Sequence, residues 1–486
     1  MVAKARIFFQ RRSFGLVLIA LALILSILAI VQTQRSSLKS IEVVYAQPLV
    51  SLNPFTYSDY NNSRLNYIYE SLVTFSEDLK ISPKLAVSFG QISESHYRFR
   101  IKQDIFFHNG TPLTSEYLKE FFGKLADIQS QASLVANIQE FQVLSPQAFD
   151  IKLQTPDPLF LSKLASVPIA YLDTDLIANP TGTGPFVLKA QSENQIYLEP
   201  FSQYHSQSPQ FNQLLLTTIP NQTQRLEYSL NNPNVLAIFG MSPVLQSQAE
   251  EFDFSLQNYI EGSTNFFLYN YNRRLSNNPN FRAALSQAMH LDMNFNQFAE
   301  GMAKDTNQLL ASGVFGYNPQ IKSLPPQEVL ADNYQPQILL PENFQKLAET
   351  LSTALNLHGI QPEFTFANAF NLTSQEISSQ FDLIFFGFKS DFYDGQSLFT
   401  TFLTTDSFNY GSYKNQLATD LYNTLAAASK PKQRQKILQE LSASLVDPVN
   451  PLAQPLFENQ VYYALKNTYD LQPRLDGYLD LTLIQF

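Results

Sequence analysis

Histidines and closely spaced aspartates are the side chains in this sequence with the most obvious chemical potential. Asp391 and Asp394 are two carboxylates of the kind that hydrolases pair for acid–base work, although their spacing alone does not indicate such a pair. No two histidines have metal-ligand spacing on one helix, and there is no H-E-x-x-H pattern. We therefore expect all the histidines to be structural or surface residues; they are His96, His108, His205, His290 and His358.

Other catalytic motifs are missing from the sequence. It contains no G-x-S-x-G elbow, no G-x-x-x-x-G-K-[ST] loop and no cysteine that could act as a nucleophile. The stretch 182–186 (Gly-Thr-Gly-Pro-Phe) superficially suggests a phosphate loop, but Pro185 removes an N–H donor where a phosphate cradle needs one. A tight turn is the better interpretation of this stretch, and the whole pattern favours binding over catalysis.

The composition of the chain excludes some kinds of binding partner and attachment. The net charge is −10 and no run of Lys or Arg is sustained, which argues against nucleic acid because that partner needs clustered positive charge. The absence of cysteine leaves the redox compartment undecided and excludes a thioether lipid anchor. Tryptophan is also absent, so any aromatic surface for a ligand must be built from Phe and Tyr.

Residues 14–31 form an uncharged apolar run that as a helix would be about 27 Å long, close to the thickness of a hydrocarbon core. Four basic residues precede it, so the positive-inside tendency places residues 1–13 in the cytoplasm and the rest of the chain outside. A cleaved signal peptide is the competing interpretation, but no small-x-small site follows the run. Both interpretations export the folded part, behind a polar linker at 32–40.

The elements that position any site begin with a strand at 41–45. Residues 97–101 alternate between apolar and basic side chains, which predicts a half-buried strand, and a second strand at 105–107 should run into a turn. Thr114 is then expected to cap a helix that carries an acidic residue in its first turn.

From about residue 336 strands and helices alternate, which predicts right-handed crossovers and a mainly parallel sheet. The expected strands are 338–340, 364–366 and 382–388, and the expected helices are 342–357, 374–380, 417–428 and one that starts at 431. Ligands bind beyond the carboxyl ends of strands in such sheets, so we expect a ligand at residues 389–395.

The order of short motifs resembles the family of peptide and nickel solute-binding proteins that serve ABC importers, from about residue 41 to the C-terminus. The motifs are Ser51-Leu52-Asn53-Pro54, Tyr69-Glu70-Ser71-Leu72-Val73, Pro83-Lys84-Leu85-Ala86, the stretch 97–114 that includes Phe107-His108-Asn109-Gly110, the stretch 182–186, Phe281-Arg282-Ala283-Ala284-Leu285, and the stretch 381–394. The resemblance implies an α/β fold of the bilobal periplasmic-binding-protein type (class II, with an extra domain) behind the N-terminal transmembrane helix.

The resemblance also implies domain boundaries. The first lobe would comprise residues 41–75, 180–265 and 463–486, with the extra domain at 76–179 inserted into it. The second lobe would comprise residues 266–462.

A ligand site follows from the same resemblance. Asp391 would bind the α-ammonium of a peptide, and the backbones of Gly387 and Lys389 would pair with the peptide as an added strand does. Phe388 would cover a ligand side chain, although packing in the core is an equal alternative, and Asp391 has the alternative of a loop or cap aspartate. Ser58 and Tyr60 fall near the place where the family's first lobe touches the ligand backbone.

The implied partners are the peptide, an ABC permease with cytoplasmic ATPases and the membrane; we expect a monomer with neither cofactor nor metal. Asp394-Gly395 replaces the family's Asp-Pro and His290-Leu291 replaces its Asp-Arg, which leaves the ligand class open. A nickel chelate, haem or an oligosaccharide on the same scaffold, a surface protein with a structural or signalling role, and an enzyme of unknown type remain alternatives. No residue is assigned to the ligand's carboxylate.

Overall fold

The computed structural model describes residues 40–56, 62–76, 80–322, 333–368, 379–404, 412–426, 428, 430–474 and 476–484. The predicted membrane segment, residues 374–378 of the predicted helix at 374–380 and the candidate residues Ser58 and Tyr60 lie outside these ranges. Within these ranges the model has no helix whose length and apolar character would let it cross a bilayer.

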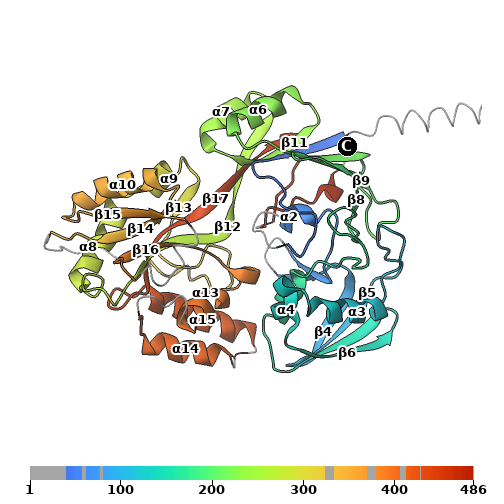
Figure 1. Ribbon diagram of the computed structural model, residues 1–486, viewed down its shortest axis with the longest axis horizontal. Coiled ribbons are helices and arrows are strands. Elements are labelled where there is room, and N and C mark those ends of the chain that lie inside the picture. Colours follow the sequence, from blue (N-terminus) through green and yellow to red (C-terminus); the bar gives the residue numbers. More distant parts are fainter. Residues whose placement is uncertain are drawn as a thin grey trace, which may run out of the picture.

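One mixed sheet of eleven strands runs through both halves of the molecule, in the order β15-β14-β16-β12-β17-β11-β1-β10-β9-β8, with β13 paired to β17. Its two longest strands, β12 (Phe254–Tyr269) and β17 (Ala453–Lys466), pair antiparallel and connect the two halves (Figure 1). The predicted lobe boundaries at 265/266 and 462/463 fall inside these two strands. The halves are called the first and the second lobe below.

The first lobe contains the N-terminal strand that the sequence predicts. β1 (Ser40–Tyr45) lies parallel to β10 (Gln213–Thr218) and to β11 (Val235–Met241), and its apolar side chains are buried on both faces. β9 (Gln195–Pro200) and β8 (Phe186–Gln191) extend this edge as antiparallel strands. The helices α6 (Gln222–Asn231) and α7 (Gln246–Glu250) cover β11 and β12 (Figure 1).

A separate antiparallel sheet lies at the far end of the first lobe, in the order β4 (Ala86–Ser93), β5 (His96–Ile101), β7 (Ala148–Leu153) and β6 (Ile138–Ser145). The helix α3 (Ser115–Leu125) packs on it and α4 (Gln129–Val135) follows. The Thr114 hydroxyl accepts a hydrogen bond from the Tyr117 N–H, so the predicted cap is confirmed, as is the alternating strand. The strand predicted at 105–107 is wrong: the chain turns back at once, and only a bridge between Phe106 and Pro112 forms.

The second lobe confirms the predicted alternation. β14 (Gln337–Pro341) lies parallel to β15 (Glu363–Ala367) and to β16 (Leu383–Lys389), whereas β16 pairs antiparallel with β12. One face of these strands packs on α8 (Pro279–Leu291), α9 (Phe295–Phe298) and α10 (Gln345–Asn356). The other face packs on α13 (Gln396–Leu403), α14 (Gln416–Ala426) and α15 (Pro431–Leu445). The sheet of this lobe is therefore covered by helices on both faces, and β16 runs through its centre.

Candidate functional site

The carboxyl end of β16 is where the sequence predicts a ligand, and the structure fixes its register. Gly387 lies opposite Asn265, and Lys389 lies opposite Ser263 on β12. The strand begins with buried side chains and ends with a more exposed segment, in which the Gly387 backbone is exposed. A side chain at Gly387 would come within 3.1 Å of the Asn265 Oδ1, so glycine keeps this stretch of backbone accessible.

Asp391 lies two residues after the end of β16 and starts a single 3₁₀ turn, η2 (Asp391–Tyr393). The residue is exposed, and its backbone N–H donates a hydrogen bond of 3.0 Å to the Ser397 hydroxyl. Its carbonyl accepts from the Asp394 N–H at 3.1 Å. The backbone of Asp391 is therefore held in a fixed turn, while its side chain stands at the surface beyond the end of a buried strand.

The two neighbours of this stretch have clear packing partners. The Phe388 ring is half-buried with its centroid 6.0 Å from that of Phe402 on α13, so part of it belongs to the core of the second lobe. Lys389 Nζ lies 3.0 Å from Glu261 Oε1 on β12, which neutralises the lysine next to the candidate ligand aspartate. A role of Phe388 or Lys389 toward a ligand stays a prediction.

Asp394, the other aspartate of the pair, has a different environment. It is buried, and its Oδ1 accepts hydrogen bonds from Arg434 Nη2 at 2.7 Å and from the Gln396 N–H at 2.8 Å. Burial raises the pKa of this carboxyl although Arg434 opposes the shift. Asp391 is thus exposed, whereas Asp394 holds α15 against the loop after β16 through Arg434. The structure therefore gives no support to a catalytic pair of these two carboxylates.

Tyr393 brings the two lobes into contact. Its ring centroid lies 5.3 Å from that of Phe75 in the first lobe, and the rings are nearly perpendicular at 87°. Phe392 and Tyr393 have φ values of 55° and 53°, a conformation that non-glycine residues adopt rarely. Gly262 on β12 comes close to the same tyrosine ring, so Tyr393 touches both the opposite lobe and a connecting strand.

Phe75 ends β2 (Val73–Phe75), which pairs with β3 (Ile81–Pro83) and forms the first-lobe wall opposite Tyr393. Arg474 Nη1 donates to the Thr74 hydroxyl at 2.7 Å, and its other guanidinium nitrogens bind Asp476. The C-terminal segment is thereby attached to β2.

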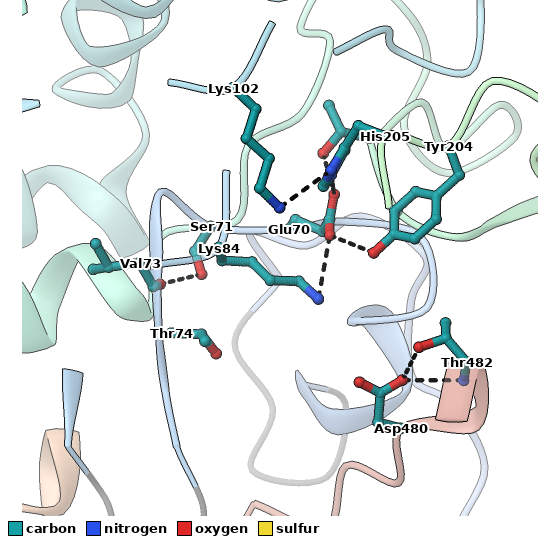
Figure 2. A network of polar contacts seen from close by, with 12 residues as sticks. Glu70, Ser71, Val73, Thr74, Lys84, Lys102, Tyr204, His205, Asp480 and Thr482 are labelled. Carbon is teal, nitrogen blue, oxygen red and sulfur yellow. Dashed lines mark hydrogen bonds and ion pairs between the residues drawn. The ribbon is translucent and has the colours of Figure 1, made fainter. Parts of the chain in front are cut away.

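Glu70, five residues before Phe75, anchors this wall through a buried polar network (Figure 2). Its carboxylate accepts hydrogen bonds from His205 at 2.7 Å, Tyr204 at 2.9 Å and Thr183 at 3.1 Å, and Lys84 Nζ lies 3.4 Å away. Burial alone would raise the pKa of Glu70, but the His205 hydrogen bond and the Lys84 charge lower it to about 2. Glu70 is therefore ionised, and it holds the start of the wall in place.

The glycines of the stretch 182–186 support the same segment. Gly184 donates its N–H to the Ile68 carbonyl at 2.9 Å, and any side chain at Gly182 would overlap that carbonyl. The stretch bends tightly against the backbone of residues 67–70, as expected for a turn and not for a phosphate loop.

A hollow of about 580 Å³ lies beside the connecting strands and is lined by both lobes. Lys304 and Ser312 contribute from the second lobe, and Arg474 contributes from the C-terminal segment. Arg474 and Tyr259, which also line it, lie close enough to the Tyr393 hydroxyl to change its pKa, which burial raises well above the ordinary value. The hollow therefore adjoins the contact between the lobes.

The sequence predicts a ligand at the end of β16, but it does not predict a role for Tyr393, Phe75 or Arg474. Tyr393 lies inside the quoted stretch 381–394, so its position two residues after Asp391 was the available signal. Phe75 and Arg474 come from segments some 400 residues apart, and only the fold brings them to the same wall. Among the residues with described positions, no group of three His, Cys, Asp or Glu side chains could hold a metal ion.

Comparisons with known proteins agree with this geometry. A family model for bacterial extracellular solute-binding proteins, family 5 (middle region), matches residues 80–337. The structure of HbpA2 from Haemophilus parasuis superposes with a TM-score of 0.80 at 17% identity over 91% of this chain and 98% of that one. DppA from Helicobacter pylori in complex with the peptide STSA superposes with a TM-score of 0.70 at 17% identity over 93% and 98% of the two chains.

A curated relative by sequence is the HTH-type transcriptional regulator SgrR of Yersinia enterocolitica, 23% identical over 256 residues. That match covers 51% of this chain but only 43% of the regulator, so the chain spans less than half the length of this relative.

The two lobes, the connecting strands and the superpositions define a two-lobed fold of the periplasmic-binding-protein type. Because the family model matches more than half of the 486 residues, the chain belongs to the bacterial extracellular solute-binding proteins, family 5. Members of this family are the solute-binding components of ABC transporters, with peptide or nickel ligands.

Proposed function

We propose that this protein captures peptides between its two lobes and delivers them to an ABC permease. The observation that carries the proposal is the exposed Asp391 just beyond the end of the buried strand β16, two residues before Tyr393, which contacts the first lobe. A carboxylate placed between two lobes that exclude water is a partner for an α-ammonium group, because a hydrogen bond to a charged group contributes about 1.5–3 kcal/mol.

The backbone next to Asp391 supports the same ligand class. The exposed Gly387 has no side chain in the way, so an extended peptide can lie along the end of β16 and pair with its main chain. Main-chain pairing of this kind gives affinity with little side-chain selectivity. The DppA structure in complex with the peptide STSA has the same fold and supports a peptide as the ligand here.

Closure of the lobes on the peptide is part of the proposal. β12 and β17 are the strands that connect the lobes, and a hinge within them would let the lobes part to admit a ligand and then restore the contact of Phe75 with Tyr393 over it. A ligand favours the closed arrangement to the extent that it binds that arrangement better. The apolar run at 14–31 would anchor the protein to the membrane, with the lobes outside the cytoplasm and close to the permease.

The experiment is a thermal-shift titration of the purified protein with one tripeptide in two forms, with a free or an acetylated amino terminus. A bound ligand raises the unfolding temperature by mass action, so the free peptide should stabilise the wild type and the acetylated peptide should not. Asp391→Ala should abolish the shift, whereas Asp127→Ala, which removes an exposed carboxylate between α3 and α4 of the first lobe, should leave it unchanged. Equal shifts with both peptide forms would contradict the ammonium role of Asp391.

A ligand sensor without transport is a second candidate, favoured by the similarity to a transcriptional regulator over about half of this chain. Such a protein would bind the same ligand but would not be needed for its uptake. Uptake of a labelled peptide that binds the purified protein, measured in cells with and without it, separates the two functions. Loss of uptake in the deletion strain supports delivery to a permease, and unchanged uptake supports sensing.

A further inference from the structure

A second cavity, of about 610 Å³, lies in the second lobe between α8, the C-terminal end of α15 and the ends of the two connecting strands. Its volume is in the range of small-molecule sites. Tyr269 closes it from the end of β12, and residues 453–455 close it from the start of β17. Among the described residues, none of the first lobe and none of the stretch 387–394 lines it, so it is separate from the site between the lobes.

One face of α8 forms a wall of the cavity, and the residues on this face recur with helical spacing. The opposite face of this helix is buried in the core through Phe281, Leu285 and Ala288. The face toward the cavity is less buried, and its residues are Ala283, Ser286, Gln287 and His290. These four side chains are not needed to hold α8 against the sheet and are available to a ligand.

Arg282 brings a positive charge to this wall without a carboxylate to balance it. It is only 6% exposed, and its two terminal nitrogens donate to the carbonyls of Ser276 and Val449, each at 2.8 Å. Its Nε is buried and has no hydrogen-bond partner within the described part of the chain, where no acidic side chain forms an ion pair with it either. A buried cation that donates to two carbonyls and lies against the Tyr271 ring is stabilised by an anion nearby.

When the other charged side chains of the lining are included, the net charge of the cavity wall stays positive. Lys322 lines the cavity and is exposed. Asp447 is the carboxylate in the lining, but it is exposed and its Oδ1 accepts a hydrogen bond from the Val449 N–H in its own loop. Burial lowers the pKa of His290, with Asp305 opposing the shift, so the imidazole is neutral at pH 7 and offers hydrogen bonds without charge.

The remainder of the lining is a mixture of amides and aliphatic surface. The larger aliphatic residues in the lining are Leu291, Ile321, Val446, Pro448, Pro451 and Pro455. A ligand that fills the cavity therefore needs an apolar body next to its charged end.

We propose that this cavity binds a small organic acid, with its carboxylate toward Arg282 and its apolar body against the proline-rich wall. The inference is independent of the function proposed for the site between the lobes. Because the cavity touches the ends of both connecting strands, its ligand would contact the elements that join the lobes.

The test is isothermal titration calorimetry of the full-length protein with three probes of nearly the same shape: indole-3-acetate, its neutral amide and the cationic tryptamine. We expect saturable binding of the acid, at least ten-fold weaker binding of the amide, and weaker binding still of the amine. Equal affinity for the acid and the amide, or no saturable binding of the acid, overturns the proposal.

Two variants assign the binding to this cavity. Ser286→Phe fills the cavity from the partly exposed face of α8 and should abolish binding of indole-3-acetate while the protein still binds its peptide. Asp391→Ala should have the reverse effect, with the acid bound as in the wild type. Acid binding that survives Ser286→Phe in the folded protein, or that is lost in Asp391→Ala, would place the acid elsewhere and contradict the inference.

Discussion

Replacing Glu70 by glutamine removes one charge from the network that anchors the first-lobe wall. The Glu70 side chain is 1% exposed, and its pKa is lowered from 4.5 to about 2. The difference between these two pKa values corresponds to about 3 kcal/mol of stability at neutral pH. Glutamine keeps the size of the side chain and an acceptor for Tyr204 but offers no charge to Lys84. We expect Glu70→Gln to lower the free energy of unfolding at pH 7 by about this amount.

The pH dependence of the difference follows from the direction of the shift. The folded state holds the proton less tightly than the unfolded state, so the contribution of Glu70 is complete above pH 4.5 and is lost as the pH falls toward 2. The stability difference between the wild type and Glu70→Gln should therefore shrink as the pH is lowered through this window. Urea unfolding followed by circular dichroism at pH 7 and at about pH 3 measures both quantities.

Glu140→Gln is the matched control for this experiment. Glu140 pairs with Lys152 at 2.8 Å, but both side chains are at least 40% exposed, and an exposed pair contributes about 0–1 kcal/mol. A Glu70→Gln protein as stable as this control at pH 7, or a stability difference that does not change with pH, would refute the reasoning about the buried network.

Two further substitutions test the packing around the site. Gly182→Ala should destabilise the protein by more than about 2 kcal/mol, because its methyl group would overlap the Ile68 carbonyl. In Gly123→Ala on α3 the new methyl group has no atom within 4 Å, so this change should stabilise the protein by about 0.5–1 kcal/mol. Thermal unfolding of both variants measures the contrast, and equal melting temperatures would contradict it. Asp394→Ala should cost about 3–5 kcal/mol in urea unfolding, because it leaves the Arg434 charge buried without its partner, and a loss under about 1 kcal/mol would show that the pair is unimportant.

Local chemistry explains what could be predicted from the sequence. The alternation in β5 and the Thr114 cap depend on residues within one turn or one strand, and the structure has both. The apolar run that became β16 was predicted to within one residue at each end, because a short apolar run between polar residues is itself a local signal of a buried strand.

The rest of the site depends on contacts between distant segments. Glu70 is held by residues as far along the chain as His205, and Tyr393 meets Phe75 across the two lobes. No local sequence pattern predicts these contacts between distant residues. The sequence also left open whether Phe388 packs or binds; the structure shows its contact with the core of the second lobe, and its contact with a ligand stays a prediction.

The distance between the lobes, measured with and without a peptide, tests the central claim most directly. The chain has no cysteine, so Lys119→Cys on α3 and Lys432→Cys on α15 can carry two spin labels at defined, exposed positions. Pulsed electron–electron double resonance should show a shorter distance between the two spin labels when a tripeptide with a free amino terminus is added. The acetylated tripeptide should leave the distance unchanged. An unchanged distance with every peptide, or the same shortening with the acetylated form, would contradict capture of a peptide through Asp391.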